Sequence, residues 1–318
     1  MRQTEWKKWA ASFLGIATIL ALVLIVWFFL FYTRGPEKQI TRDVGVENIA
    51  APTGILKIAF LDVGQGDAIL VIGPDGTTVL FDGGPDRTLL ARLGEVLPFW
   101  QHSIDMIVIT NPDKDHIAGF VPLLQTMNVG AVLEPGTSSV SATYHTLKDD
   151  IVLAQKENGT KTLIARKGTR FPIGDGAEID ILFPDRDVSG WKTNDGSIIA
   201  RVVYASTSVL LTGDATKKTE SLLGALDPVD ILKVGHHGSR TSTGESFVSQ
   251  LTPKWAVISA GFQNKYGHPH QETLNTLKKF DVTPLITSEK GTIIFTSDGR
   301  TFSEPTFIRT NIPISKNR

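Results

Sequence analysis

The chain contains no cysteine among its 318 residues. Disulfide bonds and thiolate metal sites are therefore excluded, so any bound metal must be held by histidine, aspartate, glutamate or asparagine. A large excess of positive charge is also absent, because the formal net charge is −1 at pH 7. This balance argues against a strongly basic nucleic-acid surface but leaves room for a local basic cleft. A hydrophobic content of 41% supports a sizeable core and argues against disorder.

Residues 9–33 form a long run without any charged side chain. As a helix, this run is long enough to cross a hydrocarbon core of roughly 30 Å. A cleaved signal peptide is the alternative, although the run is long for one and no small-x-small cleavage pattern follows it. We predict a single-pass membrane anchor over 1–33, a polar linker over 34–53 and a folded domain over 54–318. Positive residues flank both sides equally, and the free amino terminus favours an extracytoplasmic domain.

Two strand-rich blocks, at 55–81 and 179–211, are each followed by alternating strands and helices. This order predicts two mixed sheets packed face to face with helices outside, an α/β/β/α sandwich. Within this scheme, 117–127 and 216–226 are expected to be helices because their apolar residues recur at helical spacing.

The segment 110–116 reads TNPDKDH and follows the apolar run 106–109. Asp113, Asp115 and His116 are therefore crowded into four positions at the end of a strand, where side chains project into a cleft rather than into the core. Carboxylate and imidazole groups at this spacing suit a divalent metal. The alternative is an ordinary helix start in which Asp113 or Asp115 is the N-cap.

Further metal-capable side chains also follow apolar runs. They are Asp82, Asp214, His236, His237, His268 and His270. Each aspartate has glycine neighbours and could be a turn residue. The histidines are harder to dismiss, because five of the seven in the chain lie in these strand-end segments. Lys233 lies three residues before the histidine pair, and it could bind an anion or be a solvated strand residue.

Six segments are distinctive when taken in this order: FLDVGQGDAILV, LFDGG, ITNPDKDHIAG, NDGSIIARVVYASTSVLLTGDA, VDILKVGHHGSRTS and AVISAGFQNKYGHPH. Together they resemble the metallo-β-lactamase-fold domain of the ComEC family of competence proteins, from about Leu56 to Leu277. The resemblance implies the α/β/β/α sandwich, a divalent-metal site and hydrolytic activity. In competence proteins this domain is thought to degrade the DNA strand that is not imported.

The resemblance also implies a set of metal ligands. These are Asp113, Asp115, His116, Asp214 and one of His236 and His237, with His237 favoured. The family pattern begins with a histidine where this chain has Asn111. An amide oxygen is a weak neutral donor, so we expect one firm metal site and a second that is weak or empty. Zinc or manganese is expected, and magnesium would also suit the oxygen-rich set.

Other matching residues are expected to support the site. Asp82 would orient ligands from behind, and His270 would bind substrate or transfer protons. Asp67, Asn111 and Ser239 lie in the same motifs and are expected to belong to this supporting group. For the reaction itself, Asp115 would orient the attacking water, and His268 or Lys233 would stabilise charge on a phosphoryl oxygen.

We therefore predict a membrane-anchored metal-dependent hydrolase that acts as a phosphodiesterase or nuclease on DNA. Two alternatives are a hydrolase of a cell-envelope phosphoester or lactone, and a non-catalytic binding domain with a partly decayed metal site. Only one apolar span is visible, so we expect any channel to be a separate membrane protein. No basic run with interleaved aromatic residues, of the kind that tracks a single strand, is visible in the sequence.

Overall fold

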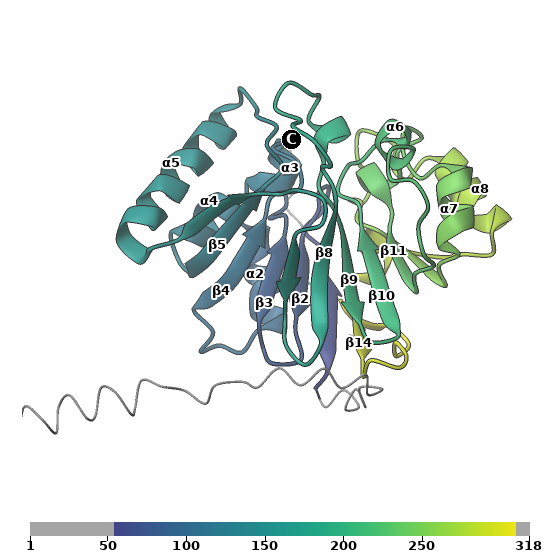
Figure 1. The fold of residues 1–318 in the computed structure, drawn as a ribbon, viewed down its shortest axis with the longest axis horizontal. Coiled ribbons are helices and arrows are strands. Elements are labelled where there is room, and N and C mark those ends of the chain that lie inside the picture. The colour runs from purple at the N-terminus through teal and green to yellow at the C-terminus, as the bar shows by residue number, and fades with distance from the viewer. Residues whose placement is uncertain (1–53, 310–318) are drawn as a thin grey trace, which may run out of the picture. The chain divides into compact units, whose positions relative to one another are not determined.

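A computed structural model describes residues 54–309. Two β-sheets pack against each other, and helices cover both outer faces, with α5 on one flank and α7 and α8 on the other (Figure 1). The predicted α/β/β/α sandwich is confirmed. Within residues 54–309 no helix is both long and apolar enough to cross a bilayer. The expected anchor over 1–33 and linker over 34–53 lie outside the described residues.

The first sheet has eight strands in the order β15-β14-β1-β2-β3-β4-β5-β6. Their bounds are β1 (Leu56–Phe60), β2 (Ile69–Ile72), β3 (Thr78–Phe81), β4 (Ser103–Val108), β5 (Asn128–Glu134), β6 (Lys161–Ile164), β14 (Thr292–Ser297) and β15 (Thr306–Ile308). The loop 61–68 joins β1 to β2, the turn 73–77 joins β2 to β3, and these strands pair antiparallel. The connections from β3 to β6 are longer, and these strands pair parallel, as crossover connections require.

The second sheet has seven strands in the order β13-β12-β11-β10-β9-β8-β7. Their bounds are β7 (Arg170–Pro172), β8 (Ala177–Phe183), β9 (Ile199–Tyr204), β10 (Thr207–Leu211), β11 (Ile231–Lys233), β12 (Trp255–Ile258) and β13 (Thr283–Ile286). The strands from β7 to β10 are antiparallel, and those from β10 to β13 are parallel. Both sheets therefore follow the same scheme, as the two blocks of the sequence predicted.

The helices differ from two of the expectations. Their bounds are α2 (Thr88–Val96), α3 (Lys114–Ile117), α4 (Phe120–Leu124), α5 (Ala142–Asn158), α6 (Lys217–Glu220), α7 (Glu245–Leu251), α8 (Gln271–Lys279) and α9 (Thr287–Lys290), with 3₁₀ turns η1 (Asn194–Gly196) and η2 (Gly235–Gly238). The helix expected over 117–127 is divided at Gly119, which packs against the backbone of Gly83. The helix expected over 216–226 is a single turn, and Gly224 downstream has a positive φ of 76°, which favours a turn.

Apolar side chains fill three layers of the sandwich. The central layer lies between the sheets and includes Phe60, Phe81, Val202 and Val257. Two outer layers bury the helices against the far face of each sheet. Strands covered on both faces must be apolar on both faces, which explains why their sequences read as continuous hydrophobic runs. Polar residues gather instead where the parallel strands end, at one edge of the sandwich, and this edge carries the site.

Candidate metal centre

Four strand ends bring aspartate and histidine side chains to one place. Asp82 follows β3, and α3 carries Asp115 and His116 after β4. In the second sheet Asp214 follows β10, and His237 lies in η2 after β11. Parallel strands end at a common edge, so segments far apart in the chain meet here.

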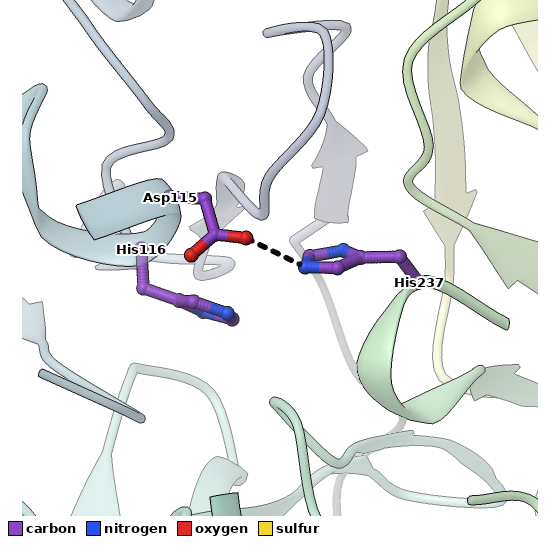
Figure 2. Close-up of side chains that lie close together, drawn as sticks. All are labelled: Asp115, His116 and His237. Atoms are coloured by element: carbon purple, nitrogen blue, oxygen red, sulfur yellow. Dashed lines mark ion pairs between the residues drawn. The ribbon is translucent and has the colours of Figure 1, made fainter. Parts of the chain in front are cut away.

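Four side chains form the centre itself. His116 Nε2 lies 3.2 Å from Asp214 Oδ2, and His237 Nε2 lies 3.2 Å from Asp115 Oδ2 and 3.6 Å from Asp214 Oδ1. Figure 2 shows Asp115, His116 and His237 directed toward a common space from α3 and η2. One donor atom from each of these three lies within 4.8 Å of the others. The structure therefore brings together Asp115, His116, Asp214 and His237 of the residues expected as ligands, but not Asp113.

Buried acceptors hold both imidazole rings from behind. His116 Nδ1 lies 2.7 Å from Asp82 Oδ2, and Thr110 donates its backbone N–H to the other oxygen of Asp82. His237 Nδ1 lies 3.0 Å from the backbone oxygen of Ser259. Because a carbonyl oxygen can only accept, Nδ1 of His237 carries the proton and its Nε2 is left free to bind a metal. Asp82 thus has the supporting position predicted for it.

The backbone of η2 is strained where it presents the histidine pair. His236 has φ of 49° and His237 has φ of 53°, both in the left-handed region. Each such residue costs about 1–3 kcal/mol, and such strain clusters at functional sites. The two side chains differ in position. His237 is buried, whereas the His236 side chain is 26% exposed and its Nε2 lies 3.7 Å from Asp214 Oδ2.

The donor set fits a divalent cation. The buried atoms His116 Nε2, His237 Nε2 and Asp214 Oδ1 have no hydrogen-bond partner. Buried polar atoms in folded proteins almost always have a partner, and a metal ion would satisfy all three. Two imidazoles with two carboxylates are a donor set that suits zinc or manganese.

Charge is concentrated in this cluster. Burial lowers the pKa of His237, but the charges of Asp214 and Asp67 outweigh it and raise this pKa to about 10. The pKa of His116 is likewise raised well above its ordinary value, because Asp214 and Asp82 outweigh burial. The same contacts lower the pKa of Asp214 despite its burial. Without a metal, the two imidazoles therefore stay protonated, and a divalent cation that binds to them would displace these protons.

Asp67 and Lys233 form a buried pair behind His237. Lys233 Nζ donates to Asp67 Oδ2 at 2.7 Å and to the carbonyl of Val234 at 3.0 Å, and both charged side chains are 0% exposed. Asp67 Oδ1 lies 3.2 Å from His237 Nδ1. Although burial opposes it, the charge of Lys233 lowers the pKa of Asp67 to about 2. The expectation that Lys233 contacts a phosphoryl oxygen does not match this position, since its ammonium is enclosed.

At the position expected for a second metal, the side-chain amide of Asn111 is engaged in hydrogen bonds. Asn111 Oδ1 accepts the backbone N–H of Asp113, and Asn111 Nδ2 donates to Asn194 Oδ1 at 2.7 Å. Asp113 accepts from the hydroxyl of Thr193 and is not among the clustered donors of the described residues. The amide of Asn194 also lies 3.5 Å from His236 Nε2. These contacts occupy the oxygen of Asn111 that a metal would need.

The remaining predicted residues line the mouth of the centre. The ring of His268 lies 5.6 Å from that of His236 and 6.2 Å from that of His237. Burial and the neighbouring histidines lower the pKa of His268 to about 4, so it is neutral at pH 7. His270 Nδ1 accepts the backbone N–H of Arg240, and its ring lies 4.8 Å from that of His268.

Several hydroxyl and amide residues of the site were not singled out from the sequence. One of them is Thr241, which hydrogen-bonds both to His236 Nδ1 and to Ser239, a residue that the sequence did single out. Thr110 holds Asp82, and Asn194 contacts both Asn111 and His236. Asn194 lies in the NDGS segment, whose polar residues immediately precede β9, and that position was an available signal.

Residues 61–261 match the Metallo-beta-lactamase superfamily. The chain belongs to this superfamily of metal-dependent hydrolases. It is 33% identical over 270 residues to ComE operon protein 3 of Bacillus subtilis, covering 78% of this chain and 34% of that protein. It is 28% identical over 273 residues to Recombination protein 2 of Haemophilus influenzae, covering 79% of this chain and 32% of that protein.

These relatives confirm that the domain is of the ComEC competence type within the metallo-β-lactamase superfamily. The chain spans about a third of the length of the curated relatives it matches. Among solved structures, Igni18, a metallo hydrolase from Ignicoccus hospitalis, matches with a TM-score of 0.50 at 16% identity, over 76% of this chain and 98% of that chain. At this identity the likeness concerns the fold alone.

Proposed function

We propose that the chain is a membrane-anchored, metal-dependent phosphodiesterase that cleaves DNA. The observation that carries the hydrolytic part is the convergence of the buried atoms His116 Nε2, His237 Nε2 and Asp214 Oδ1, none of which has a hydrogen bond, beside Asp115. The DNA substrate comes from the competence-type relatives, and the membrane anchor from the apolar run at 9–33. An extracytoplasmic domain and a separate channel partner belong to the same proposal.

Asp115, His116, Asp214 and His237 would hold the metal, with Asp82 and Asp67 fixing the imidazoles. A bound divalent ion lowers the pKa of water and polarises a phosphoryl oxygen. Asp115 has the most exposed side chain of the four, at 32%, and its pKa is lowered because His237 and His116 outweigh burial. Its carboxylate is therefore ionised and partly exposed, so it can accept a proton from water.

The proposed reaction is a simple displacement at phosphorus. The water oxygen forms a bond to phosphorus, the bond to the leaving oxygen breaks, and the proton taken by Asp115 passes to that oxygen. The products are a phosphomonoester and an alcohol. Because His268 is neutral at pH 7, it would contact the developing charge as a hydrogen-bond donor and not as a cation.

The test combines metal content with cleavage. The full chain is purified, its metal is measured by mass spectrometry, and single-stranded DNA, double-stranded DNA and bis-p-nitrophenyl phosphate are supplied as substrates. We expect about one tightly held metal per chain and cleavage of DNA. Cleavage of the small diester alone would favour an envelope phosphoester, and a chain that retains no metal under any supply would favour a binding domain.

A further inference from the structure

The rim of the centre carries exposed aromatic side chains on the loop between β12 and α8. Phe262 is 74% exposed and Tyr266 is 51% exposed, and both lie close in sequence to His268. Large exposed aromatic side chains near a polar centre are apolar surface that folding alone does not require. Lys265, between them, is also exposed.

Tyr266 is linked to the centre through His268. The two rings are stacked, with centroids 5.7 Å apart and planes inclined by 21°. The ring of His268 lies in turn 6.2 Å from that of His237. Tyr266 is thus two ring contacts away from the donor set.

Asn264 fixes this arrangement. Its Nδ2 donates to the carbonyls of Gly261 and His268, and its Oδ1 accepts the backbone N–H groups of Tyr266 and His268. One side chain therefore closes the loop on itself with four hydrogen bonds. The tyrosine ring is exposed because the loop holds it outward, and a ring held in place loses little conformational entropy when a ligand stacks on it.

We propose that Tyr266 is a stacking platform for an unpaired nucleobase of a single DNA strand, next to the phosphate that is cleaved. This inference rests on the proposed function and names the form of DNA that the site takes. Base–aromatic stacking is tolerant of sequence and is a common means of holding single strands. A base inside a duplex is already stacked and would first have to be flipped out.

Lys265 completes the subsite. Its Nζ lies 5.1 Å from the centroid of the Tyr266 ring, an exposed cation–π contact. Such contacts are weaker than base stacking, so a base displaces the ammonium from the ring. The released ammonium then lies beside the phosphates of the bound strand, where it forms a charge-assisted contact.

The experiment measures binding separately from cleavage. Fluorescence anisotropy of the full chain, with a chelator present to prevent hydrolysis, compares a labelled dT 12-mer with a 12-mer of abasic units that has the same phosphates and no bases. We expect the wild type to prefer the dT strand by about tenfold to a hundredfold. Tyr266→Ala should lose this preference, and Tyr266→Phe should keep it.

Trp100→Ala is the matched control. Trp100 is 66% exposed but precedes β4, whose other end leads to the centre, and its loss should leave the preference unchanged. Circular dichroism confirms that each variant is folded. The proposal is overturned if Tyr266→Ala still prefers dT, if Trp100→Ala loses as much, or if a duplex binds as tightly as the single strand. If the chain prefers the dT strand but cleaves no DNA, the stacking role of Tyr266 stands and the proposed nuclease function is rejected.

Discussion

His116 and His237 face each other across the centre with ring centroids 5.4 Å apart, and the Nε2 of each points toward Asp214. They come from different sheets, α3 following the first and η2 belonging to the second. The metal centre therefore joins the two halves of the sandwich, and metal binding and domain stability are coupled.

Asp214→Asn should abolish the stabilisation that a metal provides. Asp214 is buried, and its two carboxylate oxygens lie 3.2 Å from His116 Nε2 and 3.6 Å from His237 Nε2. A neutral amide in its place has nearly the same shape but binds a metal ion poorly. We expect metal affinity to fall by more than about a hundredfold, since even outer partners of a ligand are worth about 10- to 100-fold. Thermal unfolding with and without zinc or manganese measures this. Asp227→Asn, at an 85% exposed side chain, should retain the full metal-induced shift in Tm.

Lys233→Met should destabilise the chain and weaken its metal site together. The substitution leaves the carboxylate of Asp67 buried without its cation, which typically costs about 3–5 kcal/mol. Asp67→Asn combined with Lys233→Met removes both charges and should cost less than the sum of the single changes. Urea unfolding and chelator competition measure the two effects. Lys254→Met, at an exposed lysine, should change neither stability nor metal affinity. If the effects of Asp67→Asn and Lys233→Met were strictly additive, the two side chains would not act as a pair.

Asn111→His should increase occupancy of the second metal position. Imidazole is a stronger donor than the amide it replaces, although the change also removes the acceptor for the backbone N–H of Asp113. We expect a partial second metal equivalent by mass spectrometry, with a faster rate on bis-p-nitrophenyl phosphate. The surface variant Asn275→His controls for adventitious binding. If neither metal content nor rate rises, Asn111 is not the cause of the weak second position.

Glu220, which lies outside the metal centre, should make the free energy of unfolding depend on pH. Its carboxylate accepts the backbone N–H groups of Thr243 and Gly244, and burial raises its pKa above 4.5. The folded state therefore binds this proton more tightly than the unfolded state, so the contribution is full below pH 4.5 and falls as pH rises through the folded pKa. We therefore expect the difference in the free energy of unfolding, wild type minus the Glu220→Gln variant, to decrease as the pH rises. A difference that increases instead would show that the backbone hydrogen bonds outweigh burial.

The layers of the fold and the candidate metal-binding residues could be predicted because both leave a local pattern in the sequence. Apolar runs gave the strands, and Asp115, His116 and Asp214 stand directly after them. Contacts between distant segments could not be predicted in this way. The enclosure of Lys233 by Asp67 joins residues 166 positions apart, and nothing in either motif shows which lysine will be buried.

Contacts between distant segments also decide the second metal position and the arrangement of the 261–268 loop. The sequence showed that Asn111 is a poor ligand, but not that Asn194 lies against it. Aromatic residues interleaved with basic ones were absent as a continuous run, whereas the fold holds Lys265 and Tyr266 together beside His268. The expected helix at 117–127 was wrong because apolar spacing does not register the close packing of Gly119 on Gly83.

The closure of the 261–268 loop by the four hydrogen bonds of Asn264 has an evolutionary consequence. Because these bonds, with that of Gly261 to Gln65, use the backbone and not the outward-facing side chains, those side chains can vary without disturbing the residues that would hold the ion. A related chain could change the ligand that it binds by exchanging Phe262, Lys265 and Tyr266, while Asn264 and His268 stay in place.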